Sequence, residues 1–99
     1  MTAYVISEVE MLDETQGQRY RELAAASIAR HGGRYLVRGA DPQVPEGDWP
    51  AGHRIVVVEF PAMDQLRAWY ASADYAEALA IRQTALDRRL LFVEGITRA

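Results

Sequence analysis

The stretch Ile55-Val56-Val57-Val58-Glu59-Phe60 decides the fold, because it is the most strongly apolar and β-branched run in the chain. Pro61 follows it at once and is expected to end the strand. Successive side chains of a strand point to opposite faces, so positions 55 and 57 lie on one face and positions 56, 58 and 60 on the other. Both faces are apolar. The sequence therefore predicts a strand that is covered on both sides.

A second predicted strand, Leu90–Glu94, shows the same pattern, with Leu91 and Val93 on one face and Leu90 and Phe92 on the other. Helices can cover one face of such a sheet. At roughly 25 cal/mol per Å² of apolar surface, leaving the other face in water would cost on the order of several kcal/mol. We therefore expect a second copy of the sheet to cover it, which gives a homodimer. The alternative is a small exposed patch of the kind that monomers tolerate.

Capping and turn signals define the remaining elements. Asp13 followed by Gln16 is typical of a capping box at the start of a helix, and Gly32-Gly33 is typical of a helix end. Ser72 is a typical N-cap for a later helix. The expected order is a strand at Ala3–Glu10, a helix from Asp13 to about His31, a strand at Arg34–Arg38, a loop at Gly39–His53, the strand Ile55–Phe60, a helix from Asp64, a helix from Ser72 through Leu86, and the strand Leu90–Glu94.

This order of elements predicts an α+β fold of the ferredoxin-like βαββαβ type. Right-handed crossovers place the helices on the same face of a four-stranded antiparallel sheet. A chain of 99 residues is the length of one domain, so residues 1–99 are expected to form a single ferredoxin-like domain.

Charge and composition exclude several classes of partner. A net charge of −3 and a pI near 5.3 give no basic patch of the kind that binds nucleic acid. No apolar run is long enough to span a bilayer. The chain has no cysteine, which excludes disulfides, thiolate metal sites and cysteine nucleophiles. We expect a cytoplasmic protein with neither nucleic acid nor a membrane as its partner.

Polar side chains on the apolar stripes of two predicted helices are the candidates for chemistry. Tyr20 and His31 are eleven residues apart, about three helical turns, so they lie in line on the first helix. Arg82 lies on the stripe of the third helix, where it needs an anion, an acid such as Glu59 or Glu8, or a path to solvent. These positions indicate a pocket between helices and sheet.

Each candidate has a functional and a structural interpretation. His31 is either a general acid or base, since imidazole titrates near neutrality, or a helix-end histidine bonded to a free carbonyl. Tyr20 is either catalytic or an amphipathic core residue, and Arg82 either holds a ligand oxygen or forms a structural ion pair. In the functional interpretation the catalytic residues are His31, Arg82 and Tyr20, and the ligand-binding residues are Arg34, Trp69, Tyr75 and Glu59.

Signals for a metal or a cofactor are missing from the sequence. The two histidines, His31 and His53, share no metal-ligand spacing with nearby acids. There is no phosphate-binding glycine loop, nucleophile elbow or dinucleotide fingerprint. We therefore expect no metal and no cofactor.

Five motifs together resemble those of one protein family, the domain of unknown function 1330. They span nearly the whole chain in the right order. The motifs are His31–Gly39, Glu46–Trp49, Val58–Pro61, Ala68–Tyr70 with Ser72 and Tyr75, and Val93–Gly95.

The resemblance extends to the dimeric α+β barrel superfamily, whose members include antibiotic-biosynthesis monooxygenases and muconolactone isomerases. It implies a ferredoxin-like protomer whose sheet pairs face to face with that of a second copy, and a small-molecule cavity between sheet and helices. It does not imply one particular reaction.

Three functions are consistent with these observations. The first is a homodimeric small-molecule-binding protein, acting as an enzyme on a small organic acid or aromatic substrate by acid/base chemistry. The second is a non-catalytic dimerisation or accessory module. The third is a cofactor-free oxygenase of the monooxygenase kind, which would need an apolar pocket large enough for an aromatic substrate.

Overall fold

The structure is a computed structural model that describes residues 1–96, and it is a ferredoxin-like α+β fold. Its four strands form one antiparallel sheet in the order β2-β3-β1-β4, as the sequence predicts. The elements in chain order are β1 (Ala3–Met11), α1 (Glu14–Arg30), β2 (Arg34–Ala40), β3 (Arg54–Phe60), α2 (Met63–Tyr70), α3 (Ala73–Ala85) and β4 (Leu86–Glu94).

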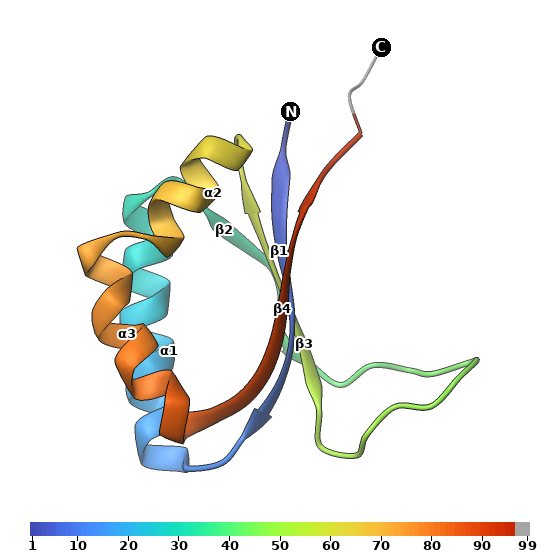
Figure 1. Cartoon of the computed structure of the whole chain (residues 1–99). Helices are drawn as coiled ribbons and strands as arrows, with labels where there is room; N and C mark the ends of the chain where they lie inside the picture. Colours follow the sequence, from blue (N-terminus) through green and yellow to red (C-terminus); the bar gives the residue numbers. More distant parts are fainter. Residues whose placement is uncertain (97–99) are drawn as a thin grey trace.

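All three helices lie on one face of the sheet, and the other face carries no helix (Figure 1). The core lies between the two layers. Val58 and Phe60 of β3 are buried there against Leu66 and Trp69 of α2 and Tyr75 of α3. The inner half of the apolar pattern of β3 is thus explained by helix packing.

The start of α1 differs from the predicted capping box in one respect. The Asp13 carboxylate accepts a hydrogen bond from the backbone N–H of Gln16 at 2.8 Å, as expected for an N-cap. The Gln16 side chain does not complete the box, however, because its oxygen accepts a hydrogen bond from the hydroxyl of Thr84. The backbone N–H of Asp13 donates instead to the carbonyl of Ala85 at 3.3 Å. The start of α1 is therefore held by the end of α3.

The last strand begins at Leu86, whereas the sequence analysis placed Leu86 in a helix and began the strand at Leu90. The reason is pairing with β1, which extends to Met11 and has Leu86 as its partner there. Extended backbone from Leu86 onward gains a hydrogen-bonded neighbour along all of β1. This longer strand places Arg88 and Arg89 in the sheet, on opposite faces.

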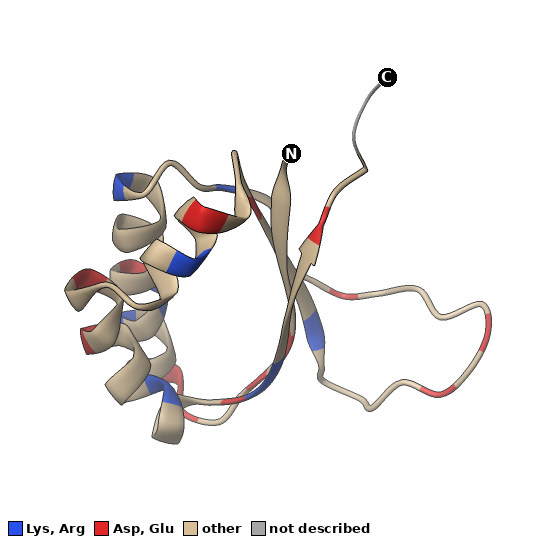
Figure 2. Ribbon diagram, turned by 45° about the horizontal axis from the view of Figure 1, so that its top comes forward, with Lys and Arg blue, Asp and Glu red and all other residues tan. Residues whose placement is uncertain are grey.

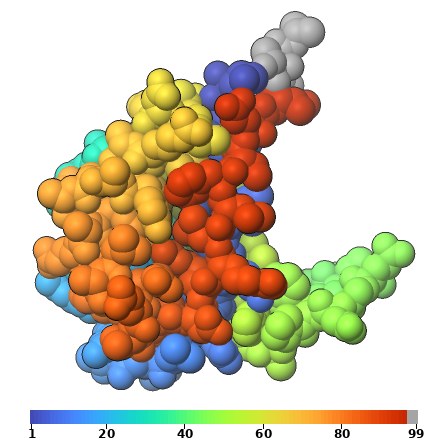
Figure 3. Space-filling view, viewed as in Figure 1, coloured from blue at the N-terminus to red at the C-terminus, as the bar shows by residue number. Residues whose placement is uncertain are grey.

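The outer face of the sheet carries several exposed apolar side chains. Leu91 is 62% exposed, Leu36 48% and Val93 36%. Leu91 lies opposite Ile6, which in turn lies opposite Val57, so these side chains form a continuous apolar band across three strands. Figure 3 shows this side of the molecule hollowed, with the loop between β2 and β3 standing off the body as an arm.

None of the described helices is long and apolar enough to cross a membrane.

The α1–β2 turn is closely packed, and this leads to a prediction about stability. A Cβ atom added to Gly33 would lie 2.7 Å from the Phe60 ring and 2.8 Å from the Ile28 side chain. We expect Gly33→Ala to destabilise the protein by about 1–3 kcal/mol, because these side chains must shift to admit a methyl group. Urea unfolding of the two proteins measures the difference.

A double-mutant cycle identifies the cause. In a Phe60→Leu background the crowding is relieved, so Gly33→Ala should cost less than it does beside the native ring. An equal cost in both backgrounds would show that the Phe60 contact is not responsible.

Candidate functional site

A cavity of about 530 Å³ lies between the helix layer and the inner face of the sheet. Its volume is in the range of small-molecule sites, and much of its wall is apolar. β1, β2, β3 and β4 supply the floor, and α1 and α2 supply the roof. Apolar residues that line it include Val5, Val58, Leu90, Ala24, Ile28 and Trp69.

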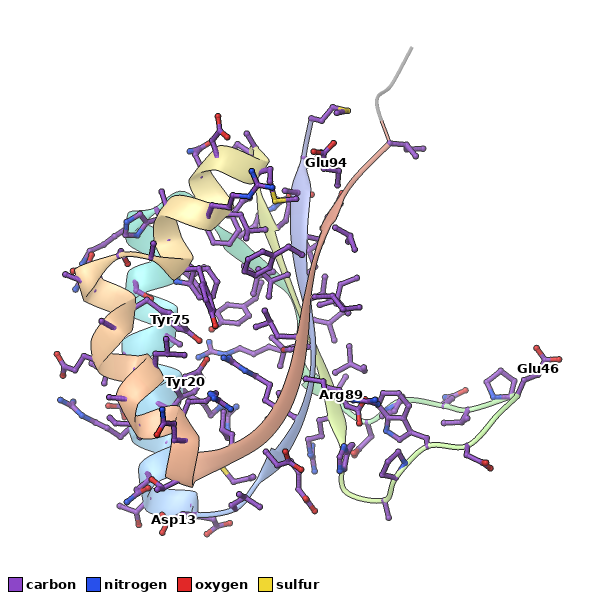
Figure 4. The ribbon with its side chains drawn as sticks, in the orientation of Figure 1. Asp13, Tyr20, Glu46, Tyr75, Arg89 and Glu94 are labelled. Atoms are coloured by element: carbon purple, nitrogen blue, oxygen red, sulfur yellow. The ribbon has the colours of Figure 1, made fainter. Side chains whose placement is uncertain are left out.

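Two tyrosines and an arginine form the main polar group beside this cavity. The hydroxyls of Tyr20 on α1 and Tyr75 on α3 are 2.7 Å apart, and both are buried (Figure 4). The guanidinium of Arg88 on β4 donates from Nη1 to both oxygens, with a distance of 3.0 Å to Tyr75. Tyr20 and Arg88 line the cavity, while Tyr75 lies behind them with no exposed surface.

These contacts indicate where the hydroxyl protons lie. Both phenolic oxygens accept from Arg88, and one hydroxyl must donate to the other. Tyr75 is fully buried, and among residues 1–96 the acceptor within reach of its hydroxyl is the oxygen of Tyr20, so we assign the shared proton to Tyr75. The Tyr20 proton is then free to be donated into the cavity. The arrangement thus presents one O–H donor, supported by a positive charge, to any molecule that enters.

The environment keeps this donor protonated at neutral pH. Burial raises the pKa of Tyr20 well above its ordinary value, and the neighbouring Tyr75 adds to the rise. Burial by itself would lower the pKa of Arg88, but the two tyrosine oxygens outweigh it and hold that pKa above its usual value. The group is therefore a neutral phenol beside a permanent cation.

The residues around the cavity carry an excess of positive charge. Four arginines line it against two glutamates, although the chain as a whole has a net charge of −3. Arg38 lies over the ring of Tyr35, with 4.4 Å from its guanidinium carbon to the ring centroid. Elsewhere, Figure 2 shows basic and acidic positions interspersed over the helices. Arg54 is paired with Asp41 at 3.8 Å, and the other lining arginines still give the cavity wall a positive character. The lining charges are Arg21, Arg38, Arg54 and Arg88 with Glu10 and Glu14.

The structure brings only part of the predicted site together. Tyr20 and Trp69 line the cavity, and Tyr75 supports Tyr20 from behind. His31 does not line it: the residue is the C-cap of α1, and its Nδ1 lies 2.9 Å from the carbonyl oxygen of Ser27. This is the helix-end interpretation that the sequence left open for His31.

The other predicted residues also lie away from the cavity. Arg34 and Glu59 form an ion pair at 2.8 Å between β2 and β3, and neither lines the cavity. Glu59 is thus the partner of Arg34 and not of Arg82. Within residues 1–96, the Nε atom of Arg82 is buried without a hydrogen-bond partner, and Arg82 does not line the cavity either.

Arg88 is the residue that the sequence analysis missed. The predicted helix ran through Leu86 and the strand began at Leu90, so Arg88 fell in an unassigned turn. A signal was present, since Arg88, Leu90 and Phe92 alternate at the period of a strand and therefore share a face. Two of these residues, Arg88 and Leu90, line the cavity.

These features define a class of protein: a ferredoxin-like α+β domain with a cavity between its sheet and helices. Within that class the chain belongs to the family described as domain of unknown function (DUF1330), whose model matches residues 2–96. No curated protein matches the sequence.

Solved structures share the fold at low sequence identity. A protein of unknown function from Rhodopseudomonas palustris matches with a TM-score of 0.78 and 18% identity, covering 98% of this chain and 84% of that one. SnoaB, a cofactor-independent oxygenase from Streptomyces nogalater, matches with a TM-score of 0.68 and 11% identity, covering 98% of this chain and 95% of that one. A dimeric protein of unknown function with a ferredoxin-like fold from Bacteroides fragilis matches with a TM-score of 0.64 and 14% identity, covering 95% of this chain and 96% of that one.

Proposed function

We propose that the protein binds a small organic acid or acidic aromatic compound in the cavity and acts on it by acid/base chemistry. The observation that carries this proposal is the group formed by Tyr20, Tyr75 and Arg88 at the wall of an otherwise largely apolar cavity. Such sites combine an apolar body with a few polar groups that orient the ligand. Here the polar group is a proton donor backed by a cation.

In this proposal a carboxylate, phenolate or enolate oxygen of the ligand accepts the Tyr20 O–H. The Arg88 charge favours negative charge on that oxygen, because charge-assisted hydrogen bonds are stronger than neutral ones. If the Glu14 carboxylate, which lines the cavity, takes a proton from a ligand carbon, the enolate oxygen that forms would be stabilised in the same way. Tyr20 and Arg88 thus take the roles that the sequence analysis gave to His31 and Arg82, and Trp69 contacts the ligand body.

We also propose that the protein works as a homodimer paired through the outer face of the sheet. The support is the apolar band on that face, with Leu91, Leu36 and Val93 exposed in the protomer. A structural neighbour from Bacteroides fragilis is described as dimeric. Pairing through this face leaves the cavity, which lies on the helix side, within each protomer.

A ligand screen tests the cavity proposal. Benzoate and other small carboxylates should raise the melting temperature of the protein, whereas benzamide, a neutral compound of the same shape, should raise it much less. Tyr20→Phe should keep the fold and weaken benzoate binding by about tenfold, the effect of losing one hydrogen bond to a charged group. Calorimetric titration measures both affinities.

Tyr4→Phe is the matched control, because Tyr4 lies on β1 but does not line the cavity. It should bind benzoate as the unaltered protein does. A protein that binds no carboxylate, phenol or lactone in the screen would favour the accessory-module alternative.

A cofactor-independent oxygenase is the second candidate, favoured by the fold likeness to SnoaB together with the apolar cavity. It predicts that an electron-rich phenolic ligand is consumed together with dissolved oxygen. Oxygen-electrode measurements on the ligands found in the screen distinguish this reaction from acid/base chemistry, which consumes no oxygen.

A further inference from the structure

We infer that Glu10, His53 and Asp87 form a binding site for a divalent first-row transition metal ion, at the edge of the organic-ligand cavity proposed above, with Glu10 lining both. The three residues come from β1, from the residue before β3, and from β4. One ligand atom of each lies within 4.8 Å of the others. With metal–ligand bonds of about 2.0–2.2 Å, two ligands of one ion are at most roughly 4.4 Å apart, so only a small side-chain adjustment is needed.

The orientation of the His53 ring is an independent observation in favour of the site. Its Nδ1 lies 2.6 Å from a carboxylate oxygen of Glu8, and its Nε2 lies on the side of Glu10, 3.8 Å from that carboxylate. A metal-binding histidine usually donates its second ring N–H to a carboxylate in this way, which fixes the tautomer and aims the free nitrogen at the ion.

Glu8 is itself held in place by a further contact. Arg89 donates to its other carboxylate oxygen from both Nε and Nη2, on the side of the sheet that faces the long loop (Figure 4). These hydrogen bonds hold the Glu8 carboxylate in place beside the His53 ring. The network supplies a rigid outer layer around His53.

The local charge also suits a divalent cation. The charges of Glu8 and Arg89 offset each other, which leaves the His53 ring with the two carboxylates of Glu10 and Asp87. These two acids lie directly opposite each other on β1 and β4, a placement that is destabilising for like charges without a cation between them. A hollow of about 290 Å³, lined partly by His53, Asp87 and Arg89, gives an ion access to the ring.

The donor set indicates the kind of metal. One imidazole nitrogen with two carboxylates suits Zn²⁺, Mn²⁺ or Fe²⁺, whereas Mg²⁺ and Ca²⁺ prefer oxygen ligands alone. The sequence analysis expected no metal because His53 has no acid at metal-ligand spacing. The ligands are instead brought together by the β1–β4 pairing and by the return of the long loop into β3.

Metal titration of the 99-residue chain tests the inference, using untagged, chelator-treated protein without any organic ligand. Calorimetry with ZnCl₂ and with MnCl₂ should show one ion bound per chain for at least one of the two metals, and MgCl₂ should bind much more weakly. His53→Gln and Asp87→Asn should weaken binding by at least about 100-fold, and Glu8→Gln by about 10- to 100-fold, as for other outer-layer carboxylates.

Matched controls are His31→Gln and Asp48→Asn, which change a histidine and an acid outside the cluster. Both should bind the metal as the unaltered protein does. The inference is overturned if the unaltered protein binds neither Zn²⁺ nor Mn²⁺ below millimolar concentration. It is also overturned if the folded His53→Gln and Asp87→Asn variants, checked by circular dichroism, bind as well as the controls. Because no organic ligand is present, neither result bears on the cavity proposal.

Discussion

Replacing Leu91 by aspartate is expected to convert the proposed dimer into monomers and leave each protomer folded. Leu91 is 62% exposed in the protomer, so a charged side chain there remains in contact with water and should change protomer stability by less than about 0.5 kcal/mol. In a face-to-face dimer the same carboxylate would be removed from water against an apolar band. Burying an unpaired charge is far more costly than exposing one.

The effect on association should be large, because a two-fold symmetric interface contains each substitution twice. We expect the dissociation constant of the dimer to rise by at least about 100-fold, which corresponds to roughly 3 kcal/mol. Sedimentation velocity at micromolar concentration measures it: the unaltered protein should sediment as a dimer and the variant as a monomer.

Leu12→Asp provides the matched control, since Leu12 is 58% exposed but lies between β1 and α1, outside the sheet. It should remain dimeric. A monomeric unaltered protein, or a Leu91→Asp variant that stays dimeric, would contradict pairing through this face.

The fold could be predicted because its signals are local and agree with each other. The apolar run Ile55–Phe60 indicates a strand without reference to any other segment, and Asp13 and Ser72 cap the helices that they were expected to cap. The element order then leaves few topologies. The largest boundary error, at Leu86, arose where pairing with β1 extends the last strand, a long-range effect that local periodicity does not report.

The site was harder to predict because its parts are far apart in sequence. Tyr20 is a polar residue on an apolar helix stripe, and this local signal identified it, whereas Tyr75 was predicted as a ligand-binding residue. Their meeting with Arg88 depends on how α1, α3 and β4 pack. His31 gave the same local signal, yet its ring bonds a carbonyl of its own helix. The periodicity of the sequence thus shows on which face of a helix a polar residue lies, but it does not show which residue becomes its hydrogen-bond partner.

Arg88→Met is expected to reduce the affinity for benzoate by about 100-fold, the value of a charge-assisted interaction of about 3 kcal/mol. The affinity for benzamide should change much less, because a neutral ligand gains little from the cation. The fold should persist, since the Tyr20 and Tyr75 hydroxyls remain bonded to each other at 2.7 Å. Calorimetric titration of both compounds separates the loss of charge from a general loss of the cavity.

Arg88→Lys sharpens the same experiment. Lysine keeps the positive charge but is a single ammonium on a flexible stem, without the planar guanidinium that holds both tyrosine oxygens. Benzoate affinity should therefore lie between those of the native protein and Arg88→Met. The control is Arg67→Met, since Arg67 is an exposed arginine of α2 that does not line the cavity. Two results would show that the charge on β4 does not select the ligand. One is that Arg88→Met weakens the binding of benzoate and of benzamide equally. The other is that Arg67→Met weakens benzoate binding as much as Arg88→Met does.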